Sequence, residues 1–371
     1  MNNMKKYLYM LLMAAMTMVG CKKADTNNEL MMLVGTYTYD GSHGIYSYRF
    51  NPQTGETAII DSLEMVNPSY LTISEDGQQV YAVCETNDER ASLSSIRLNE
   101  DGSMQLLQTV PTEGGDPCYV ASNEKIAVTA NYSGGSMSVF ALSGQGTQLG
   151  QAVLFPGAIG GPDLSRQNTP HVHCACFTPD GEYILATDFS ADRILSFRVN
   201  GATVEPNGVA SVVSADSGPR HLIFSNDGRF AYLMSELSGN VTVFGYADGR
   251  LESLQEIASD SVGARGGADV RLSPDGKFLY SSNRLQAEGI AIFAVDSDTG
   301  LLTRIGYQPT GAHPRMFNIT PDGQFLLCCC RDSDRIQIFR RDLTTGFLSD
   351  THRDIRVSKP VCVQFGGLTQ K

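Results

Sequence analysis

The chain has 371 residues, of which 42% are hydrophobic and 18% are charged, and its net charge is −12. This composition excludes a wholly disordered protein and provides enough apolar material for a large core. Long-range electrostatics will not draw so acidic a chain to nucleic acid or to an anionic bilayer surface, so an anionic ligand needs a local basic site.

The N-terminal segment has the pattern of a bacterial export signal. Two lysines precede an apolar stretch over residues 7–18 that is too short to cross a bilayer. The Met-Val-Gly-Cys that follows resembles a lipobox, which predicts cleavage of residues 1–20, lipidation of Cys21 and a polar tether over residues 21–30. An ordinary cleaved signal and an uncleaved anchor are the alternatives. The expectation is a lipoprotein exported to the cell envelope that touches the membrane only through its N-terminal lipid.

Residues 31–371 contain one phrase repeated seven times. "GPRHLIFSNDGRFAYLMSEL" at 218–237 is nearly restated at 266–285 and 312–331. Asp-Gly pairs begin at Asp76, Asp180, Asp227, Asp275 and Asp322; the last four are 47, 48 and 47 apart, and the gap of 104 holds a degenerate copy at residues 122–124. A second set of anchors, spaced by 46 to 53 residues, gives seven copies: Pro68, Pro117, Pro170, Pro219, Gly267, Pro314 and Pro360.

Each copy reads as four short strands separated by turns. Examples are "SYLTIS", "QVYAVCE", "SLSSIRLN" and "MQLLQTV" in the first copy. A period of this length with four strands predicts an all-β, seven-bladed propeller with antiparallel blades. The last anchor supplies only "PVCVQFG", so the strands at 30–38, 43–51 and 56–64 are expected to complete that blade and close the ring. The Asp-Gly pairs predict tight turns with positive φ.

Eight cysteines remain beyond Cys21, and none belongs to a Cys-x-x-Cys motif. They lie in apolar strand-like runs, so buried small side chains are expected: Cys84, Cys118, Cys174, Cys176, Cys328, Cys329, Cys330 and Cys362. The run "HVHCAC" at 171–176 suggests zinc, but alternation along a strand places its histidines and cysteines on opposite faces. No metal and no cofactor is therefore expected.

The copies differ where side chains should meet at one mouth of the central channel. Just after the anchors stand Ser69, Cys118, His171, Arg220, Ala268, Arg315 and Val361, and nine residues past each Asp of Asp-Gly stand Glu85, Phe189, Glu236, Arg284 and Arg331, with Asp188 one earlier. His173, His221 and His313 also lie close to anchors. Several unlike charges around one cavity predict a site, although strand-end polar residues can also serve only blade packing. The longest anchor spacing contains "FPGAIGGPDLSRQNTP", a loop expected to overhang this mouth.

The segments "TPHVHCACFTPDGEYILATDFSADRILSF", "GPRHLIFSNDGRFAYLMSEL", "LSPDGKFLYSSNR" and "HPRMFNITPDGQFLL" resemble the seven-bladed propeller lactonase family, over roughly residues 31 to 367. Members include propeller-type 6-phosphogluconolactonases and carboxymuconate lactonizing enzymes. The resemblance implies a metal-independent site of His, Arg and Glu. Carried onto this chain, it implies His171 or His173, Arg220 and Glu236, with Arg284 or Arg315 as a further arginine. Asp188-Phe189-Ser190 and Ala268 depart from the family pattern.

The expected chemistry is hydrolysis of a sugar lactone by an activated water. Glu236 or His171 is the candidate general base, and Arg220 and Arg315 are candidates to stabilise an oxyanion or hold an acidic group. His173, Asp188, His221, Arg284, Arg315 and Glu85 are the candidate substrate-binding residues. The small-molecule substrate is expected to be 6-phosphogluconolactone or, because of the export signal, a related exported sugar lactone. A lactonizing cycloisomerase and a noncatalytic binding propeller are the alternatives, and no oligomeric state is predicted. The chain has no Trp, which disfavours a WD40 scaffold.

Overall fold

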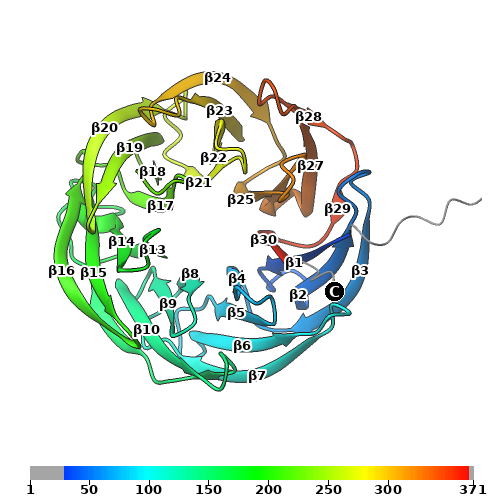
Figure 1. Cartoon of the computed structure of the whole chain (residues 1–371), viewed down its shortest axis with the longest axis horizontal. Helices are drawn as coiled ribbons and strands as arrows, with labels where there is room; N and C mark the ends of the chain where they lie inside the picture. Colours follow the sequence, from blue (N-terminus) through cyan, green and yellow to red (C-terminus); the bar gives the residue numbers. More distant parts are fainter. Residues whose placement is uncertain (1–28, 367–371) are drawn as a thin grey trace, which may run out of the picture.

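The computed structural model describes residues 29–366, which form a closed ring of seven antiparallel sheets (Figure 1). The predicted seven-bladed propeller is confirmed. The first three blades contain β4 (Leu71–Ile73), β5 (Gln79–Cys84), β6 (Ser92–Leu98) and β7 (Met104–Pro111); β8 (Pro117–Ser122), β9 (Ile126–Asn131), β10 (Ser136–Ser143), β11 (Gln148–Leu149) and β12 (Val153–Pro156); and β13 (Val172–Phe177), β14 (Tyr183–Asp188), β15 (Arg193–Asn200) and β16 (Thr203–Val212).

The remaining blades follow the same order from the hub outward. They contain β17 (Pro219–Phe224), β18 (Phe230–Ser235), β19 (Asn240–Ala247) and β20 (Arg250–Ala258); β21 (Gly267–Leu272), β22 (Phe278–Asn283), β23 (Gly289–Val295) and β24 (Leu302–Pro309); β25 (Pro314–Ile319), β26 (Phe325–Cys330), β27 (Arg335–Arg341), β28 (Leu348–Asp350) and β29 (Ile355–Arg356); and β30 (Pro360–Gly366), β1 (Leu30–Thr36), β2 (Gly44–Phe50) and β3 (Thr57–Glu64). Two short 3₁₀ turns, η2 (Phe189–Ala191) and η3 (Arg331–Ser333), are the helical elements of the described chain, and neither has the length to cross a membrane.

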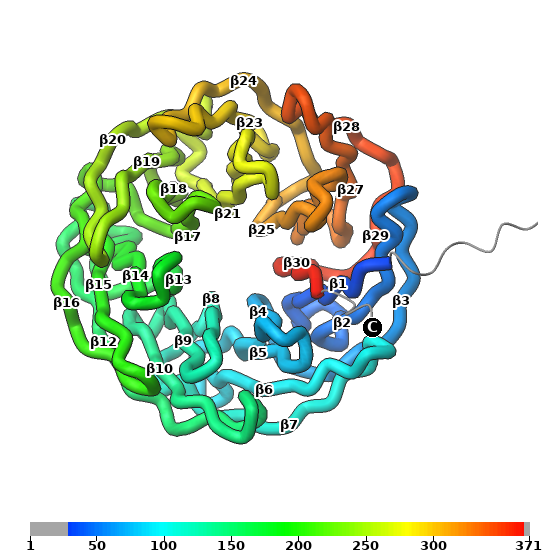
Figure 2. Tube along the Cα trace, in the orientation of Figure 1, coloured from blue at the N-terminus to red at the C-terminus, as the bar shows by residue number. Residues whose placement is uncertain are grey.

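The ring closes by pairing the two ends of the described chain. The C-terminal β30 runs antiparallel to β1, so this sheet has the order β3-β2-β1-β30. Figure 2 shows the red C-terminal strand beside the blue N-terminal one at the hub. This confirms the predicted shared blade, and β1 begins one residue before the predicted start of the propeller. The predicted signal sequence and Cys21 lie outside the described residues.

The inner hairpins turn as the sequence predicts. In the hairpin between β17 and β18, Gly228 has φ of 72°, a conformation that glycine adopts without strain. The Asp227 carboxylate accepts hydrogen bonds from the Ser225 hydroxyl at 2.6 Å and from the Arg229 amide at 3.2 Å. The same Ser/Thr-to-Asp bond recurs at the other Asp-Gly turns, from Ser74, Thr178, Ser273 and Thr320. Repetition of this local chemistry fixes the repeated geometry.

Apolar side chains between adjacent blades hold the ring together. The apolar clusters combine residues from neighbouring sheets, as where Leu185 of β14 packs with Leu222 and Leu233 of the next blade. A buried tyrosine in the second strand also donates a hydrogen bond to a backbone carbonyl of the following blade, from Tyr81 to Gly146 and from Tyr232 to Gly300. The eight cysteines of the described chain are buried free thiols, as predicted.

The inner strands pair irregularly with their neighbours at one end of the channel. The register between the first and second strands shifts near the anchors, for example between Pro117 and Tyr119, Pro219 and His221, and Gly267 and Val270. A bulge re-aims side chains at the edge of a ladder, so neighbouring residues there can both point toward the channel. This end of the channel is called the mouth. The opposite end carries the Asp-Gly turns.

Candidate active site

A carboxylate surrounded by three guanidinium groups lies at the mouth. Glu236 follows β18 directly, and its Oε2 accepts from Arg220 Nε at 3.2 Å and pairs with Arg284 Nη2 at 2.9 Å. Its Oε1 pairs with Arg166 Nη2 at 2.6 Å. Arg220 is 1% exposed and Arg284 is 5% exposed, so two of these cations are held inside the protein. The sequence predicted Glu236, Arg220 and Arg284, and the structure brings them together.

Backbone carbonyls fix the two buried arginines. Arg220 Nη1 donates to Ala268 O at 2.6 Å, and Arg284 donates from Nε and Nη2 to Gly266 O and Gly267 O at 3.1 and 3.0 Å. Ala268 takes part in this network through its backbone carbonyl and not through its side chain.

The electrostatics of Glu236 follow from these contacts. Burial alone would raise the pKa of Glu236, but Arg284, Arg220 and Arg166 outweigh burial and hold that pKa at about 2. Burial, opposed by Glu236, lowers the pKa of Arg284 to about 9. Glu236 is therefore a permanent anion at neutral pH and a very weak base.

Arg166 is a member of the site that the sequence reasoning missed. It comes from the long loop between β12 and β13, which was expected to overhang the mouth and does reach it. Arg166 Nη2 also donates to Tyr132 OH at 3.3 Å, and its guanidinium lies 5.5 Å from the centre of the Phe189 ring. The available signal was that Arg166 is the one basic residue in "FPGAIGGPDLSRQNTP".

Glu85 and Arg315 form a second ion pair at the mouth. Arg315 Nη2 donates to Glu85 Oε1 at 3.4 Å, and Tyr37 OH donates to the same oxygen at 2.8 Å. The Arg315 guanidinium also lies 5.4 Å from the centre of the Tyr37 ring. Burial and then the positive charge of Arg315 lower the pKa of Arg220, so the two guanidiniums repel each other across the site. Both predicted residues join the site, and Tyr37 is an addition.

His171 is held in one orientation at the mouth. Its ring stacks on Tyr132 with centroids 4.1 Å apart and an angle of 5° between planes. Nδ1 lies 2.8 Å from Tyr132 O, which accepts only a hydrogen bond, so Nδ1 carries the proton. Nε2 then holds a lone pair, and it lies 3.2 Å from the Thr169 hydroxyl. Burial lowers the pKa of His171, which keeps the ring neutral at pH 7.

Below the mouth, aromatic rings meet in the channel. His173 and His221 have ring centroids 5.2 Å apart, His221 also contacts Tyr119 at 5.5 Å, and Tyr119 stacks on Tyr70 at 4.4 Å. His221 Nδ1 lies 2.8 Å from Asp269 Oδ1. Burial lowers the pKa of both histidines, to about 3 for His221. These two predicted residues form a floor beneath the ion pairs, with Asp269, Tyr70 and Tyr119 as members that the sequence reasoning missed.

Comparisons with known proteins agree with this fold. The family described as "Lactonase, 7-bladed beta-propeller" matches residues 31–365. The chain belongs to this lactonase family. It is 32% identical to a 6-phosphogluconolactonase of Formosa agariphila, over 88% of this chain and 97% of that protein. Among solved structures, a candidate 6-phosphogluconolactonase of Bacteroides uniformis is 57% identical with a TM-score of 0.89, covering 91% of this chain and 99% of that one. A periplasmic gluconolactonase of Pseudomonas aeruginosa is 32% identical with a TM-score of 0.87, covering 92% and 100%.

Asp188 is the predicted residue that the structure does not bring into the site of this lactonase-family propeller. Its carboxylate accepts from Arg193 Nε at 2.9 Å and from the Ala158 amide at 3.1 Å, and it is fully buried. Asp188 ends β14 one position before Phe189, which occupies the place that Glu236 has after β18. Because successive residues of a strand point to opposite faces, a one-residue offset sends the carboxylate away from the Glu236 cluster.

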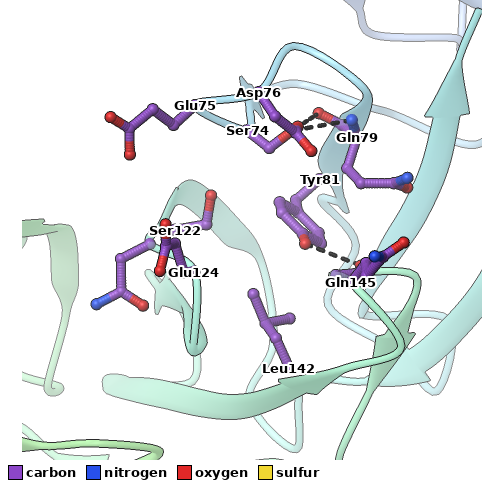
Figure 3. Close-up of a pocket in the computed structure, with 11 residues that line it drawn as sticks. Ser74, Glu75, Asp76, Gln79, Tyr81, Ser122, Glu124, Leu142 and Gln145 are labelled. Atoms are coloured by element: carbon purple, nitrogen blue, oxygen red, sulfur yellow. Dashed lines mark hydrogen bonds between the residues drawn. The ribbon is translucent and has the colours of Figure 1, made fainter.

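A hollow of about 600 Å³ lies at the opposite end of the blades, between the turns of two neighbouring sheets (Figure 3). Its lining includes the exposed acidic residues Glu75, Asp76 and Glu124, and Figure 3 shows Tyr81 and Leu142 among the other side chains that line it. The residues that line it include no Lys, Arg or His. Negative charge at the rim disfavours an anionic ligand, so the basic mouth is the candidate site. Within residues 29–366, no group of three His, Cys, Asp or Glu residues is placed to hold a metal ion.

Proposed function

We propose that this chain is a lactonase that hydrolyses a sugar lactone, either 6-phosphogluconolactone or a related exported sugar lactone. The observation that carries the proposal is the convergence of Arg166, Arg220, Arg284 and Arg315 at the mouth of an otherwise acidic propeller of the lactonase family. Hydrolysis of a lactone develops negative charge on the carbonyl oxygen, which fixed cations in a partly dry cleft stabilise. The names of the Formosa and Pseudomonas relatives support the same reaction class.

Two guanidiniums have donors available for the developing oxyanion. Within the described residues, Arg220 Nη2 and both Nε and Nη1 of Arg315 have no hydrogen-bond partner. Their mutual repulsion favours an anion between them. A charged donor aimed at the tetrahedral intermediate is worth roughly 10²- to 10³-fold in rate.

His171 suits the general base better than Glu236 does. Its Nδ1–H is fixed by Tyr132 O, which leaves the Nε2 lone pair for a water that replaces the exposed Thr169 hydroxyl as its partner. The water oxygen attacks the lactone carbonyl while its proton passes to Nε2. The ring C–O bond then breaks, and the same proton passes to the departing ring oxygen, which becomes a hydroxyl.

Glu236 serves as a positioning residue in this scheme. With a pKa of about 2 it accepts no proton from water at neutral pH, but it fixes Arg220 and Arg284 and balances part of their charge. Loss of Glu236 therefore misplaces the donors that face the oxyanion.

A panel of sugar lactones tests the proposal with purified protein lacking residues 1–20. The intact protein should open at least one lactone well above its spontaneous rate. Arg220→Ala, His171→Asn and Glu236→Ala should each lower kcat/KM by 10²-fold or more, since each removes a charge, a base or a support. Arg198→Ala, an exposed pair with Glu182 at 3.8 Å, is the matched control and should change nothing. A rate equal to the spontaneous background for every lactone contradicts the proposal.

The same panel separates the alternatives. Conversion of muconates without lactone opening would identify a lactonizing cycloisomerase. Tight binding of a lactone without turnover, unaffected by Glu236→Ala, would identify a binding propeller.

We also propose that the protein is an exported lipoprotein anchored through Cys21. The basic and apolar N-terminal segment followed by Met-Val-Gly-Cys supports this placement, as does the periplasmic location in the name of the Pseudomonas relative. Metabolic labelling with a fatty acid should mark the wild-type protein in membranes, and Cys21→Ser should abolish the label. Unlabelled wild-type protein in the cytosolic fraction contradicts the proposal.

A further inference from the structure

Arg166 differs from the other cations of the site in how it is held. Its side chain is 36% exposed, whereas those of Arg220 and Arg284 are 1% and 6% exposed. The two buried arginines give donors to backbone carbonyls, which fix them in the wall. Within residues 29–366, Arg166 makes its hydrogen bonds through Nη2 alone, and its Nε and Nη1 have no hydrogen-bond partner. It therefore keeps two donors, on a partly exposed side chain, that can bind a ligand.

The loop that carries Arg166 is built to hold it there. Arg265 Nη2 pairs with Asp163 Oδ2 at 2.6 Å and also bridges to Asp216, so one guanidinium ties the loop to the segments that precede β17 and β21. Next to Arg166, Gln167 donates to Phe189 O at 3.0 Å and to Asp192 Oδ1 at 2.9 Å, and it is buried. A loop fixed on both sides of Arg166 presents its guanidinium at a defined place.

Glu236 does not depend on Arg166 to balance its negative charge. One carboxylate faces three guanidiniums, so Arg220 and Arg284 still compensate Glu236 when Arg166 binds a ligand. A planar guanidinium with two free donors matches a carboxylate or phosphate group in a forked arrangement.

We propose that Arg166 is a specificity-determining residue that binds an anionic substituent, phosphate or carboxylate, on the lactone at a distance from the ring being opened. This role rests on the proposed lactonase function. Arg166 then selects charged sugar lactones over neutral ones, while Arg220 and Arg315 act on the carbonyl that reacts.

The kinetic test compares glucono-1,5-lactone, which is neutral, with 6-phosphoglucono-1,5-lactone and with a lactone that carries a free carboxylate. We expect Arg166→Met to lower kcat/KM for the charged lactones by about 10- to 100-fold, mainly through KM, and to change the neutral lactone by less than about threefold. Arg166→Lys should recover part of the preference, because it restores the charge without the fork. Arg198→Met, a matched loss of one positive charge near the opposite end of the blade, should leave the ratio unchanged. Comparison of the loss in kcat/KM for the phosphate-bearing and carboxylate-bearing lactones identifies the group that Arg166 binds.

A purely structural role for Arg166 gives a different result. If Arg166 serves only to hold Glu236, Arg166→Met lowers the rates for neutral and charged lactones by the same factor, and this outcome overturns the inference. So does an unchanged ratio with normal rates for both.

Binding without turnover keeps this test separate from failure of the lactonase proposal. Titration calorimetry with 6-phosphogluconate and gluconate should show preference of the wild-type protein for the phosphorylated acid, and Arg166→Met should lose about 10-fold or more of it. If no lactone is opened but this preference is present and lost in Arg166→Met, the lactonase proposal fails and the assignment of Arg166 as an anion selector stands. Equal affinities of wild type and Arg166→Met for 6-phosphogluconate overturn the assignment.

Discussion

Replacement of Glu236 by glutamine should destabilise the protein in a way that depends on pH. The Glu236 side chain pairs with three cations, of which Arg220 and Arg284 are almost fully buried. Glutamine keeps the size and one acceptor oxygen but removes the negative charge. The buried guanidiniums then face each other without a counterion, and removal of one partner from a buried ion pair is strongly destabilising.

The size of the effect follows from the pKa of Glu236. Its pKa lies at about 2 in the folded protein against 4.5 for an ordinary glutamate, which corresponds to about 3 kcal/mol of folding free energy at neutral pH. Because the folded pKa is the lower one, this stabilisation is complete above pH 4.5 and disappears as the pH falls toward 2. A loss of about 3 kcal/mol also lies in the range measured when one partner of a buried pair is removed.

Urea unfolding of wild type and Glu236→Gln at several pH values is the assay. The difference in free energy of unfolding should be about 3 kcal/mol at pH 7 and should shrink steadily below pH 4.5, because the unfolded wild-type chain then protonates Glu236 while the folded protein keeps it charged until the pH nears 2. Glu182→Gln, which lies on an exposed pair with Arg198, is the control and should show no resolvable difference at any pH. A difference in free energy of unfolding below about 1 kcal/mol at pH 7, or a difference that persists unchanged at pH 2.5, contradicts this prediction.

Two further predictions concern groups below the mouth. Asp269→Asn should lower the free energy of unfolding at pH 7 by about 3 kcal/mol in urea titrations, because buried Asp269 pairs with Arg271 at 3.1 Å and bonds His221; a loss under about 1 kcal/mol would show that Arg271 finds compensation elsewhere. Burial raises the pKa of the thiols of Cys328 and Cys329, and that of Cys362 to about 12, so peptide mapping after treatment with a thiol reagent at pH 8 should find these three labelled only in denaturant. Rapid labelling of any of the three in the native protein would contradict their burial.

The fold could be predicted from the sequence because every blade repeats the same turn residues and the same apolar strand pattern. Asp227 and Gly228 form their turn from neighbouring residues, and the apolar strands need only the next copy of themselves to pack against. Counting from the anchors also placed Arg220, Arg315 and Glu236 together, because equivalent positions of each blade reach the same end of the channel.

Fixed offsets from the anchors did not predict every residue of the site. Arg166 belongs to a loop with no counterpart in the other copies, so no offset from an anchor leads to it. Asp188 lies one position from the offset that reaches the site, and strand alternation turns it toward Arg193. Asp269 and Tyr119 follow their anchors by two residues, as the predicted His221 does, and the register shifts at the start of the inner strands bring such positions together in the channel.

The mouth carries its charges at a cost to the folded protein. Burial lowers the pKa values of Arg284 and Arg220, and neighbouring positive charge lowers them further, from Arg220 for Arg284 and from Arg315 for Arg220. Glu236 and Glu85 offset part of this repulsion, but two carboxylates face Arg166, Arg220, Arg284 and Arg315, so positive charge is in excess within this cluster. We expect an anion that enters the mouth to relieve the excess and, because it would bind the folded state alone, to stabilise the fold. The proposed affinity of the mouth for an acidic ligand would thus follow from the same imbalance that weakens the folded protein.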